Sequence, residues 1–263
     1  MRLRNVWVGA LALALAATVA ACGGGQGTSS TSTEPPPGAT KVDTATAGEV
    51  SGIVALDGTA PMNEAIKMNA DPVCVKENTT PQFQETFEVA DGKLANVFVY
   101  IKDGLGNYVY DAPTETATID QMNCRYHPHV FGMRVNQPLT IVNSDPTLHN
   151  IHAIPKANKE FNNGQPIQGM KMTHTWETKE VMVPFKCDVH GWMNAYVGVL
   201  DHPYFQVTGK DGKFDLKTVP PGTYTIEAWH EKLGAMTQSV TLGPKETKEI
   251  TFTFKASGPA ATD

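Results

Sequence analysis

Short apolar runs closed by turn residues recur along most of this chain, and they constrain the fold more than any other feature of the sequence. Asp-Gly, Gly-Pro and Pro-Pro-Gly sequences close or separate these runs. Such spacing, with no long segment of helical periodicity, predicts an all-β protein built from β-sandwiches. The one stretch that leaves room for a helix, and only a short one, is Pro155–Thr173. The apolar runs are Val50–Leu56, Phe87–Val89, Val97–Ile101, Gln238–Leu242, Glu249–Phe254 and the strand that follows the turn in Pro220–Trp229.

A turn signal at Lys210-Asp211-Gly212 separates two further runs, Phe205–Thr208 and Lys213–Leu216. An Asp-Gly pair between strand-like segments is a strong hairpin signal. The sequence therefore predicts that these two segments pair with each other.

The N-terminus has the features of an export signal. Arg2 and Arg4 precede an apolar run that is too short and too alanine-rich for a membrane span. The sequence Val19-Ala20-Ala21-Cys22-Gly23 resembles the lipobox of bacterial lipoproteins, in which Cys22 becomes the lipidated first residue; ordinary cleavage near the same alanines is the alternative. We expect a signal peptide over residues 1–21 and a flexible, lipidated linker over residues 22–47. The mature protein is then anchored to a membrane of the cell envelope and faces the periplasm or the exterior.

The charge balance narrows the classes of partner. Removing residues 1–21 removes two arginines and no acid, so the formal charge moves from -6 to -8. No basic patch with interleaved aromatic residues is present in the sequence, so we expect no nucleic-acid binding. No arrangement of serine, histidine and acid is legible either, and we expect no enzyme activity.

The cysteine count points to one special thiol. If Cys22 is lipidated, Cys74, Cys124 and Cys187 remain in an oxidising compartment, and one of them must stay unpaired. Sequence alone leaves all three pairings open. We favour a Cys74–Cys124 disulfide, because Cys187 lies in a segment that looks like a metal-binding loop. No CxxCH sequence occurs, so covalently bound haem is not expected.

That segment is the CxxHxxM loop formed by Cys187, His190 and Met193. A thiolate, an imidazole and a thioether on one short loop suit copper, which accepts soft sulfur and nitrogen ligands. His149 follows the strand-like run Leu139–Val142 and would supply a second imidazole. These residues predict one copper ion in a type 1-like His2Cys site, with Met193 at longer range.

Residues 113–202 resemble the cupredoxins, the family of plastocyanin and pseudoazurin. The resemblance implies a Greek-key β-sandwich in which His149, Cys187 and His190 bind copper. It also implies that the side chain of Asn150 ties the two ligand loops together. The matching segments are Tyr126–Phe131, Val135–Asn143, His149-Asn150 and the loop with Cys187, His190 and Met193.

The spacing of the last ligand departs from that family. Plastocyanin-like loops read CxxHxxxxM, whereas only two residues separate His190 from Met193. This spacing resembles the binuclear copper centre of terminal oxidases, which needs a second loop cysteine that this chain does not supply. We therefore predict a mononuclear site. For Met193, the axial ligand and a thioether packed in the core remain the two alternatives.

A second resemblance involves both ends of the mature chain. The sequence Asp211-Gly212-Lys213-Phe214, followed by Pro-Pro-Gly-Thr-Tyr at 220–224, resembles the carboxypeptidase regulatory-like (transthyretin-like) β-sandwich. The first strand of that family, G-x-V-x-G-x-V, is matched at Gly48–Val54. The resemblance implies that residues 48–112 and 203–256 form one sandwich into which 113–202 is inserted. A sequential split near residue 203 is the alternative, and residues 257–263 are expected to be disordered.

His127 and His129 form an HxH pair on one predicted strand face, which suits either a second metal ion or a solvated pair. Taken together, the sequence predicts a membrane-tethered, copper-binding electron-transfer protein. Its partners would be redox proteins of a respiratory or other electron-transfer chain. The alternative is a non-redox copper carrier, storage or resistance protein outside the cytoplasm. Burial of the ligands distinguishes the two, because a carrier needs exposed Met and His side chains.

Overall fold

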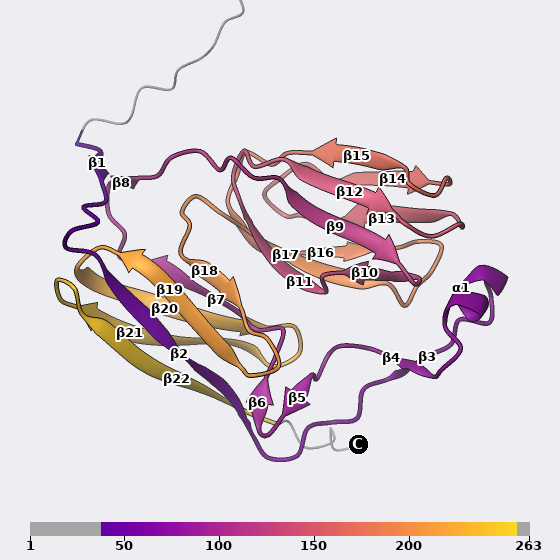
Figure 1. Ribbon diagram of the computed structural model, residues 1–263, viewed down its shortest axis with the longest axis horizontal. Helices are drawn as coiled ribbons and strands as arrows, with labels where there is room; N and C mark the ends of the chain where they lie inside the picture. The colour runs from indigo at the N-terminus through magenta and orange to yellow at the C-terminus, as the bar shows by residue number, and fades with distance from the viewer. Residues whose placement is uncertain (1–37, 257–263) are drawn as a thin grey trace, which may run out of the picture. The chain divides into compact units, whose positions relative to one another are not determined.

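The computed structural model describes residues 38–256, and nearly all of its regular structure is β-strand (Figure 1). The prediction of an all-β protein built from β-sandwiches is confirmed. The predicted signal peptide, the lipidation site Cys22 and the tail 257–263 lie outside the described residues. Within the described residues, no helix has the length and apolar character needed to cross a membrane.

One sandwich is built from strands near both ends of the described chain. Its first sheet has the order β18-β7-β20-β21, and its second has the order β19-β2-β6-β5 with β22 paired along β2. Strands that precede residue 113 and strands that follow residue 203 therefore share both sheets. These strands are β2 (Gly48–Asp57), β5 (Val89–Ala90), β6 (Lys93–Leu94), β7 (Phe98–Asp103), β18 (Phe205–Val207), β19 (Lys213–Val219), β20 (Gly222–His230), β21 (Gly234–Leu242) and β22 (Thr247–Lys255).

The segment that contains β18 and β19 differs from the predicted hairpin. Gly212 does adopt the left-handed conformation that the turn requires, with φ of +66°. However, β18 pairs with β7 and β19 pairs with β2, so the hairpin prediction was wrong. The strands separate because their apolar side chains belong to different clusters: Phe205 packs against Phe98, whereas Phe214 lies in the core between the sheets. The partners of β18 and β19 are therefore determined by the clusters in which their side chains are buried, and not by the turn between them.

The other sandwich holds all of the predicted ligands. Its sheets have the orders β10-β9-β12-β15 and β11-β17-β16-β13-β14. Pro155–Thr173, the one stretch that left room for a helix in the sequence, contains β14 and most of β15. The helix that the described residues do contain, Pro72–Glu77, lies outside that stretch, so the expectation was wrong. Alternate residues Phe161, Asn163 and Gln165 are the more buried ones, which is the period of a strand. The strands are β9 (Ala117–Met122), β10 (Arg125–His127), β11 (Val130–Arg134), β12 (Leu139–Asn143), β13 (His149–Ala153), β14 (Phe161–Gln165), β15 (Lys171–His174), β16 (Glu180–Lys186) and β17 (Asn194–Leu200).

Two paired glycines allow the sandwiches to pack closely. Gly132 on β11 lies opposite Gly198 on β17. A Cβ atom on Gly198 would lie 2.3 Å from the ring of Phe98, and one on Gly132 would lie 2.4 Å from the ring of Phe205. Only glycine leaves room for these rings. A buried ion pair between His129 and Glu231 also joins the two sandwiches, with 2.5 Å between Nε2 and Oε1.

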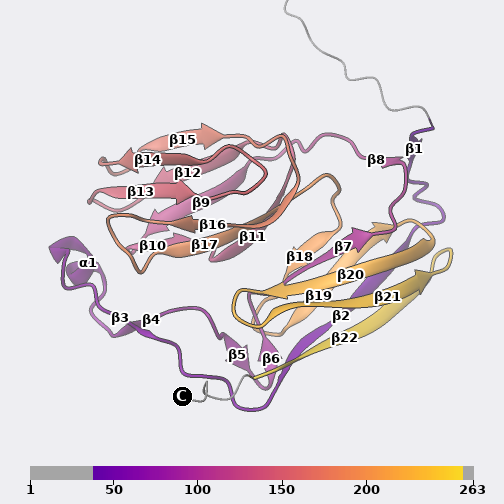
Figure 2. The ribbon, with the colours of Figure 1, turned by 180° about the vertical axis from the view of Figure 1, so that it is seen from behind.

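The connection between β2 and β5, residues 58–88, reaches the end of the sandwich that carries the ligands; we call it the strap (Figure 1, Figure 2). It contains β3 (Ala65–Ile66), the helix α1 (Pro72–Glu77) and β4 (Gln82–Phe83). Asp71 caps α1 and Pro72 occupies its first turn, both of which favour helix initiation. A Cys74–Cys124 disulfide ties α1 to the turn between β9 and β10, which confirms the predicted pairing. Cys187 is a free, buried thiol.

The predicted flexible linker ends earlier than expected. Its last residues include β1 (Thr40–Lys41), which pairs in parallel with β8 (Tyr108–Val109). Residues 40–41 are therefore part of a two-stranded sheet.

Candidate metal centre

The structure brings together three of the four predicted ligands at one end of their sandwich. His149 is the first residue of β13, Cys187 directly follows β16, and His190 lies in the turn between β16 and β17. One ligand atom from each residue lies within 4.8 Å of the other two. All three side chains are closed off from solvent, with residue exposures of 0% for His149 and 2% for both Cys187 and His190.

Backbone hydrogen bonds define the loop between β16 and β17. The amide of Met193 donates to the carbonyl of His190 at 2.9 Å, and the amide of Cys187 donates to the carbonyl of Met193 at 3.2 Å. The amide of His190 donates to Cys187 Sγ at 3.3 Å. Met193 itself is 2% exposed and packs in the same apolar cluster as Cys187. The loop thus holds the thiol and the thioether in one buried region.

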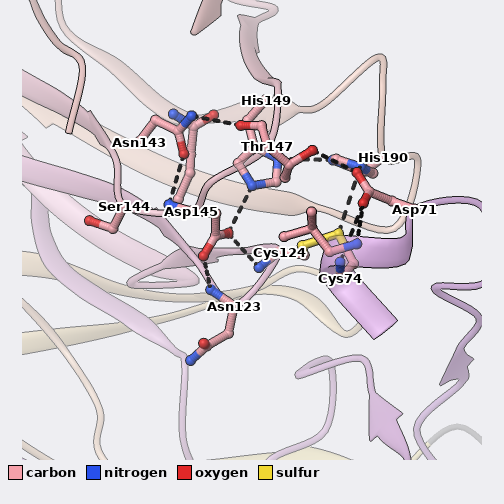
Figure 3. Close-up of polar contacts among 12 residues, drawn as sticks. Asp71, Cys74, Asn123, Cys124, Asn143, Ser144, Asp145, Thr147, His149 and His190 are labelled. Carbon is pink, nitrogen blue, oxygen red and sulfur yellow. Dashed lines mark hydrogen bonds and ion pairs between the residues drawn. A yellow bond between two sulfur atoms is a disulfide. The ribbon is translucent and has the colours of Figure 1, made fainter. Parts of the chain in front are cut away.

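Each histidine pairs with an aspartate that sequence reasoning missed (Figure 3). Nε2 of His149 lies 2.8 Å from Oδ2 of Asp145, and Nε2 of His190 lies 3.0 Å from Oδ2 of Asp71. A carboxylate only accepts hydrogen bonds, so Nε2 is the protonated nitrogen in both rings. Hydrogen bonds of this kind fix the tautomer of metal-binding histidines in many proteins.

The opposite nitrogens of the two rings face each other. Nδ1 of His149 lies 2.9 Å from Nδ1 of His190, and Cys187 Sγ lies 3.9 Å from the latter atom. With both Nε2 atoms protonated, a ring that also carries a proton on Nδ1 is cationic and donates from it, and without that proton Nδ1 presents a lone pair. Two lone pairs at this distance beside a thiol repel each other unless a proton or a metal cation lies among them. The donor set therefore fits a metal ion, and two imidazoles with one thiolate form the trigonal set that copper prefers.

The charges of the site support a thiolate. Burial raises the pKa of the Cys187 thiol, but hydrogen bonds with His149, His190 and nearby backbone groups outweigh burial and bring this pKa to about 6. Burial likewise raises the pKa of Asp145, and its hydrogen bonds with His149 and the amides of residues 123 and 124 bring that pKa below the usual value. The side chains thus favour an anionic sulfur beside paired carboxylates.

Asn150 connects the two ligand loops. Its Oδ1 accepts hydrogen bonds from the amides of Asp188, at 2.7 Å, and Val189, at 3.3 Å, and lies 3.2 Å from Cys187 Sγ. Its Nδ2 donates to Asn162 at 2.7 Å. One side chain on β13 therefore orients the backbone that carries the thiol.

His127 and His129 do not share a strand face, so that prediction was wrong. His127 ends β10, whereas β11 begins only at Val130. His129 is buried, with Nε2 paired to Glu231 and Nδ1 at 3.2 Å from the carbonyl of Asn194. The chain leaves the sheet between the two histidines, and both ring nitrogens of His129 have partners within the protein.

No protein-family model and no curated protein sequence matches the chain. Among solved structures, a copper-containing nitrite reductase from Thermus scotoductus SA-01 is 15% identical, with a TM-score of 0.32, over 36% of this chain and 24% of that chain. The chain therefore spans about a quarter of that reductase.

A purple cupredoxin from Nitrosopumilus maritimus is 24% identical, with a TM-score of 0.28, over 32% of this chain and 98% of that chain. A Cu(I) form of an amicyanin mutant is 16% identical, with a TM-score of 0.29, over 34% and 86% of the respective chains. Likenesses this weak carry no argument about function.

Proposed function

We propose that the protein is a copper-binding electron-transfer protein with one mononuclear, type 1-like site. His149, Cys187 and His190 would bind the ion, and Met193 would be the weak fourth ligand. The observation that carries this proposal is the facing pair of Nδ1 atoms, 2.9 Å apart, beside a buried free cysteine. A copper ion held there would alternate between Cu(I) and Cu(II) and so carry single electrons.

The surrounding chain supports electron transfer because it restrains the ligand side chains. His149 is anchored in β13, and Asn150 holds the backbone of the Cys187 loop. Ligands that keep their positions when the charge of the site changes keep the reorganisation energy of electron transfer low.

Burial favours electron transfer over copper delivery. A carrier that exchanges copper quickly needs accessible ligands, whereas His149, Cys187 and His190 are at most 2% exposed. For the same reason we propose that the protein is not an enzyme acting on a metal-bound substrate.

The location of the protein in the cell is proposed from the sequence of its N-terminal residues, which the structure does not describe. We propose that the chain is exported, lipidated at Cys22 and tethered to a membrane of the cell envelope. There it would exchange electrons with redox proteins of a respiratory or other electron-transfer chain. The lipobox-like sequence at residues 19–23 supports the tether.

Spectroelectrochemistry of the copper-loaded protein tests the proposal. We expect one copper ion per chain, a reversible one-electron couple, and slow removal of the ion by a chelator. Rapid exchange with no reversible couple would instead favour a copper carrier.

A further inference from the structure

Two carboxylates from different parts of the chain face the two candidate histidines. Asp145 belongs to the loop before β13, in the same sandwich as the ligands. Asp71 belongs to the strap, which connects strands of the other sandwich. Each carboxylate lies one imidazole ring away from an Nδ1 atom of the site.

The orientation of Asp71 is fixed by four hydrogen bonds. Its Oδ1 accepts from the amides of Val73, at 2.7 Å, and Cys74, at 3.4 Å. Its Oδ2 accepts from the hydroxyl of Thr147, at 2.8 Å, and from Nε2 of His190, at 3.0 Å. Because Thr147 lies just before His149, one oxygen atom of the strap contacts both ligand loops.

Asp145 is held in the same manner. Its Oδ1 accepts from the amide of Asn123 at 2.8 Å. Its Oδ2 accepts from the amide of Cys124, at 2.7 Å, and from Nε2 of His149, at 2.8 Å. The side chain is 4% exposed, so water does not replace these partners.

The Cys74–Cys124 disulfide joins the two carboxylates into one unit (Figure 3). The amide of Cys74 donates to Asp71, and the amide of Cys124 donates to Asp145. Cys74 Sγ also lies 3.7 Å from Nε2 of His190. The strap is therefore bonded covalently at the point where both aspartates meet the histidines.

We propose that Asp71 and Asp145 are positioning residues of the copper site, which hold both histidines as Nε2-protonated tautomers and stabilise Cu(II) relative to Cu(I). This inference rests on the proposed function. Cu(II) carries one positive charge more than Cu(I), and a buried negative charge attracts it more strongly. Outer hydrogen bonds also keep the ring oriented and its free nitrogen basic. A segment of the other sandwich thus completes the copper site.

If Asp71 and Asp145 only stabilised the fold, their substitution would have a different effect. Both aspartates also accept hydrogen bonds from backbone amides, and loss of these bonds lowers stability without changing the copper potential. The reduction potential and the ratio of Cu(II) to Cu(I) affinity therefore separate the two roles.

The test compares Asp71→Asn and Asp145→Asn with two control variants in the full chain. Thr147→Val removes one hydrogen bond to Asp71 without removing a charge. Glu160→Gln removes the charge of a carboxylate that is 59% exposed and pairs with His152 instead of a ligand. Each Asp→Asn change is expected to raise the midpoint potential and to weaken Cu(II) binding about 10- to 100-fold. Cu(I) binding should weaken less, and Glu160→Gln should change neither.

The ¹⁵N NMR spectrum of the diamagnetic Cu(I) form of the unchanged protein gives a second readout that needs no variant. We expect protonated Nε2 atoms in both His149 and His190, and a protonated Nδ1 in either ring would overturn the inference. If the unchanged protein binds no copper through Cys187, the proposed function fails. If it binds copper but both Asp→Asn variants keep its potential and affinities, only the role of the aspartates fails.

Discussion

The Nδ1 atoms of His149 and His190 face each other at 2.9 Å, although the two residues are 41 positions apart in the chain. The paired aspartates hold the protons on the far sides of both rings, so the facing atoms are free to bind a cation. The candidate metal centre is therefore formed by histidines whose outer nitrogens are already paired within the protein.

Substituting Asn150 with alanine should weaken both the fold and the metal site. The change removes the 2.7 Å hydrogen-bond partner of the part-buried amide of Asp188, which costs about 0.5–1.5 kcal/mol of unfolding free energy. Copper affinity should fall about 10- to 100-fold, because the Cys187 loop loses its support. Chemical denaturation and copper titration measure the two effects. Asn107→Ala, at an exposed position, is the matched control, and equal losses in both variants would contradict the role of Asn150.

Met193→Leu tests the fourth ligand. The two side chains have similar volumes, so the free energy of unfolding should change by less than about 1.5 kcal/mol. If the thioether contacts copper, the visible spectrum and the midpoint potential both change while copper stays bound. An unchanged spectrum would show that Met193 only fills the core.

Removing the disulfide should loosen the strap. The bond links residues 50 positions apart, and Cys74→Ala with Cys124→Ala should lower the free energy of unfolding by about 2–4 kcal/mol. Because the strap covers His190, the buried thiol of Cys187 should also react faster with a thiol reagent in the metal-free protein. Unchanged labelling kinetics in the double variant would argue that the strap stays in place without its covalent bond.

The ion pair between the sandwiches predicts a pH dependence of stability. Burial raises the pKa of Glu231, but the hydrogen bond and charge attraction with His129 outweigh burial and bring this pKa below the ordinary value of 4.5. A carboxyl whose pKa is lower in the folded state stabilises the fold above its ordinary pKa, and this contribution disappears as the pH falls through the folded-state pKa.

At pH 7, Glu231→Gln should therefore lower the free energy of unfolding by about 1–3 kcal/mol. The difference from the unchanged protein should shrink below about pH 4.5, where the carboxyl of the unfolded chain also takes up a proton. Urea denaturation at several pH values measures this trend. Glu249→Gln, at an exposed position of β22, should show no comparable loss, and a pH-independent difference for Glu231→Gln would refute the assignment.

The sequence was sufficient to predict those parts of the candidate site that depend only on residue type and on short spacings. The CxxH spacing pointed to Cys187 and His190, whose ligand atoms the structure places close to that of His149. The odd number of cysteines, together with the metal-like loop around Cys187, favoured the Cys74–Cys124 disulfide that the structure contains. The aspartates were missed for two reasons. Asp71 lies 119 positions from His190, and only the tertiary fold brings them together. Asp145 precedes His149 by four positions, but this spacing indicates contact only on a helix, whereas these residues lie in a loop and at a strand start.

The two wrong predictions about the fold also arose because contacts between distant residues decide the structure at those places. The Gly212 turn was recognised correctly, but the partners of β18 and β19 are distant strands that a local signal cannot specify. In Pro155–Thr173, the alternating burial of Phe161, Asn163 and Gln165 marks a strand, yet polar residues at two inward positions hide that pattern in the sequence. In this molecule, strands pair according to which side chains they bury together, and those strands are often far apart in the sequence.

The visible spectrum of the copper-loaded protein beside that of Cys187→Ser tests the central claim most directly. A thiolate bound to Cu(II) gives an intense charge-transfer band that a serine hydroxyl cannot give. We predict this band in the unchanged protein, with one copper ion per chain, and its complete loss in Cys187→Ser. An unchanged protein that binds copper without the band, or a Cys187→Ser variant that keeps it, would contradict a copper site built on Cys187.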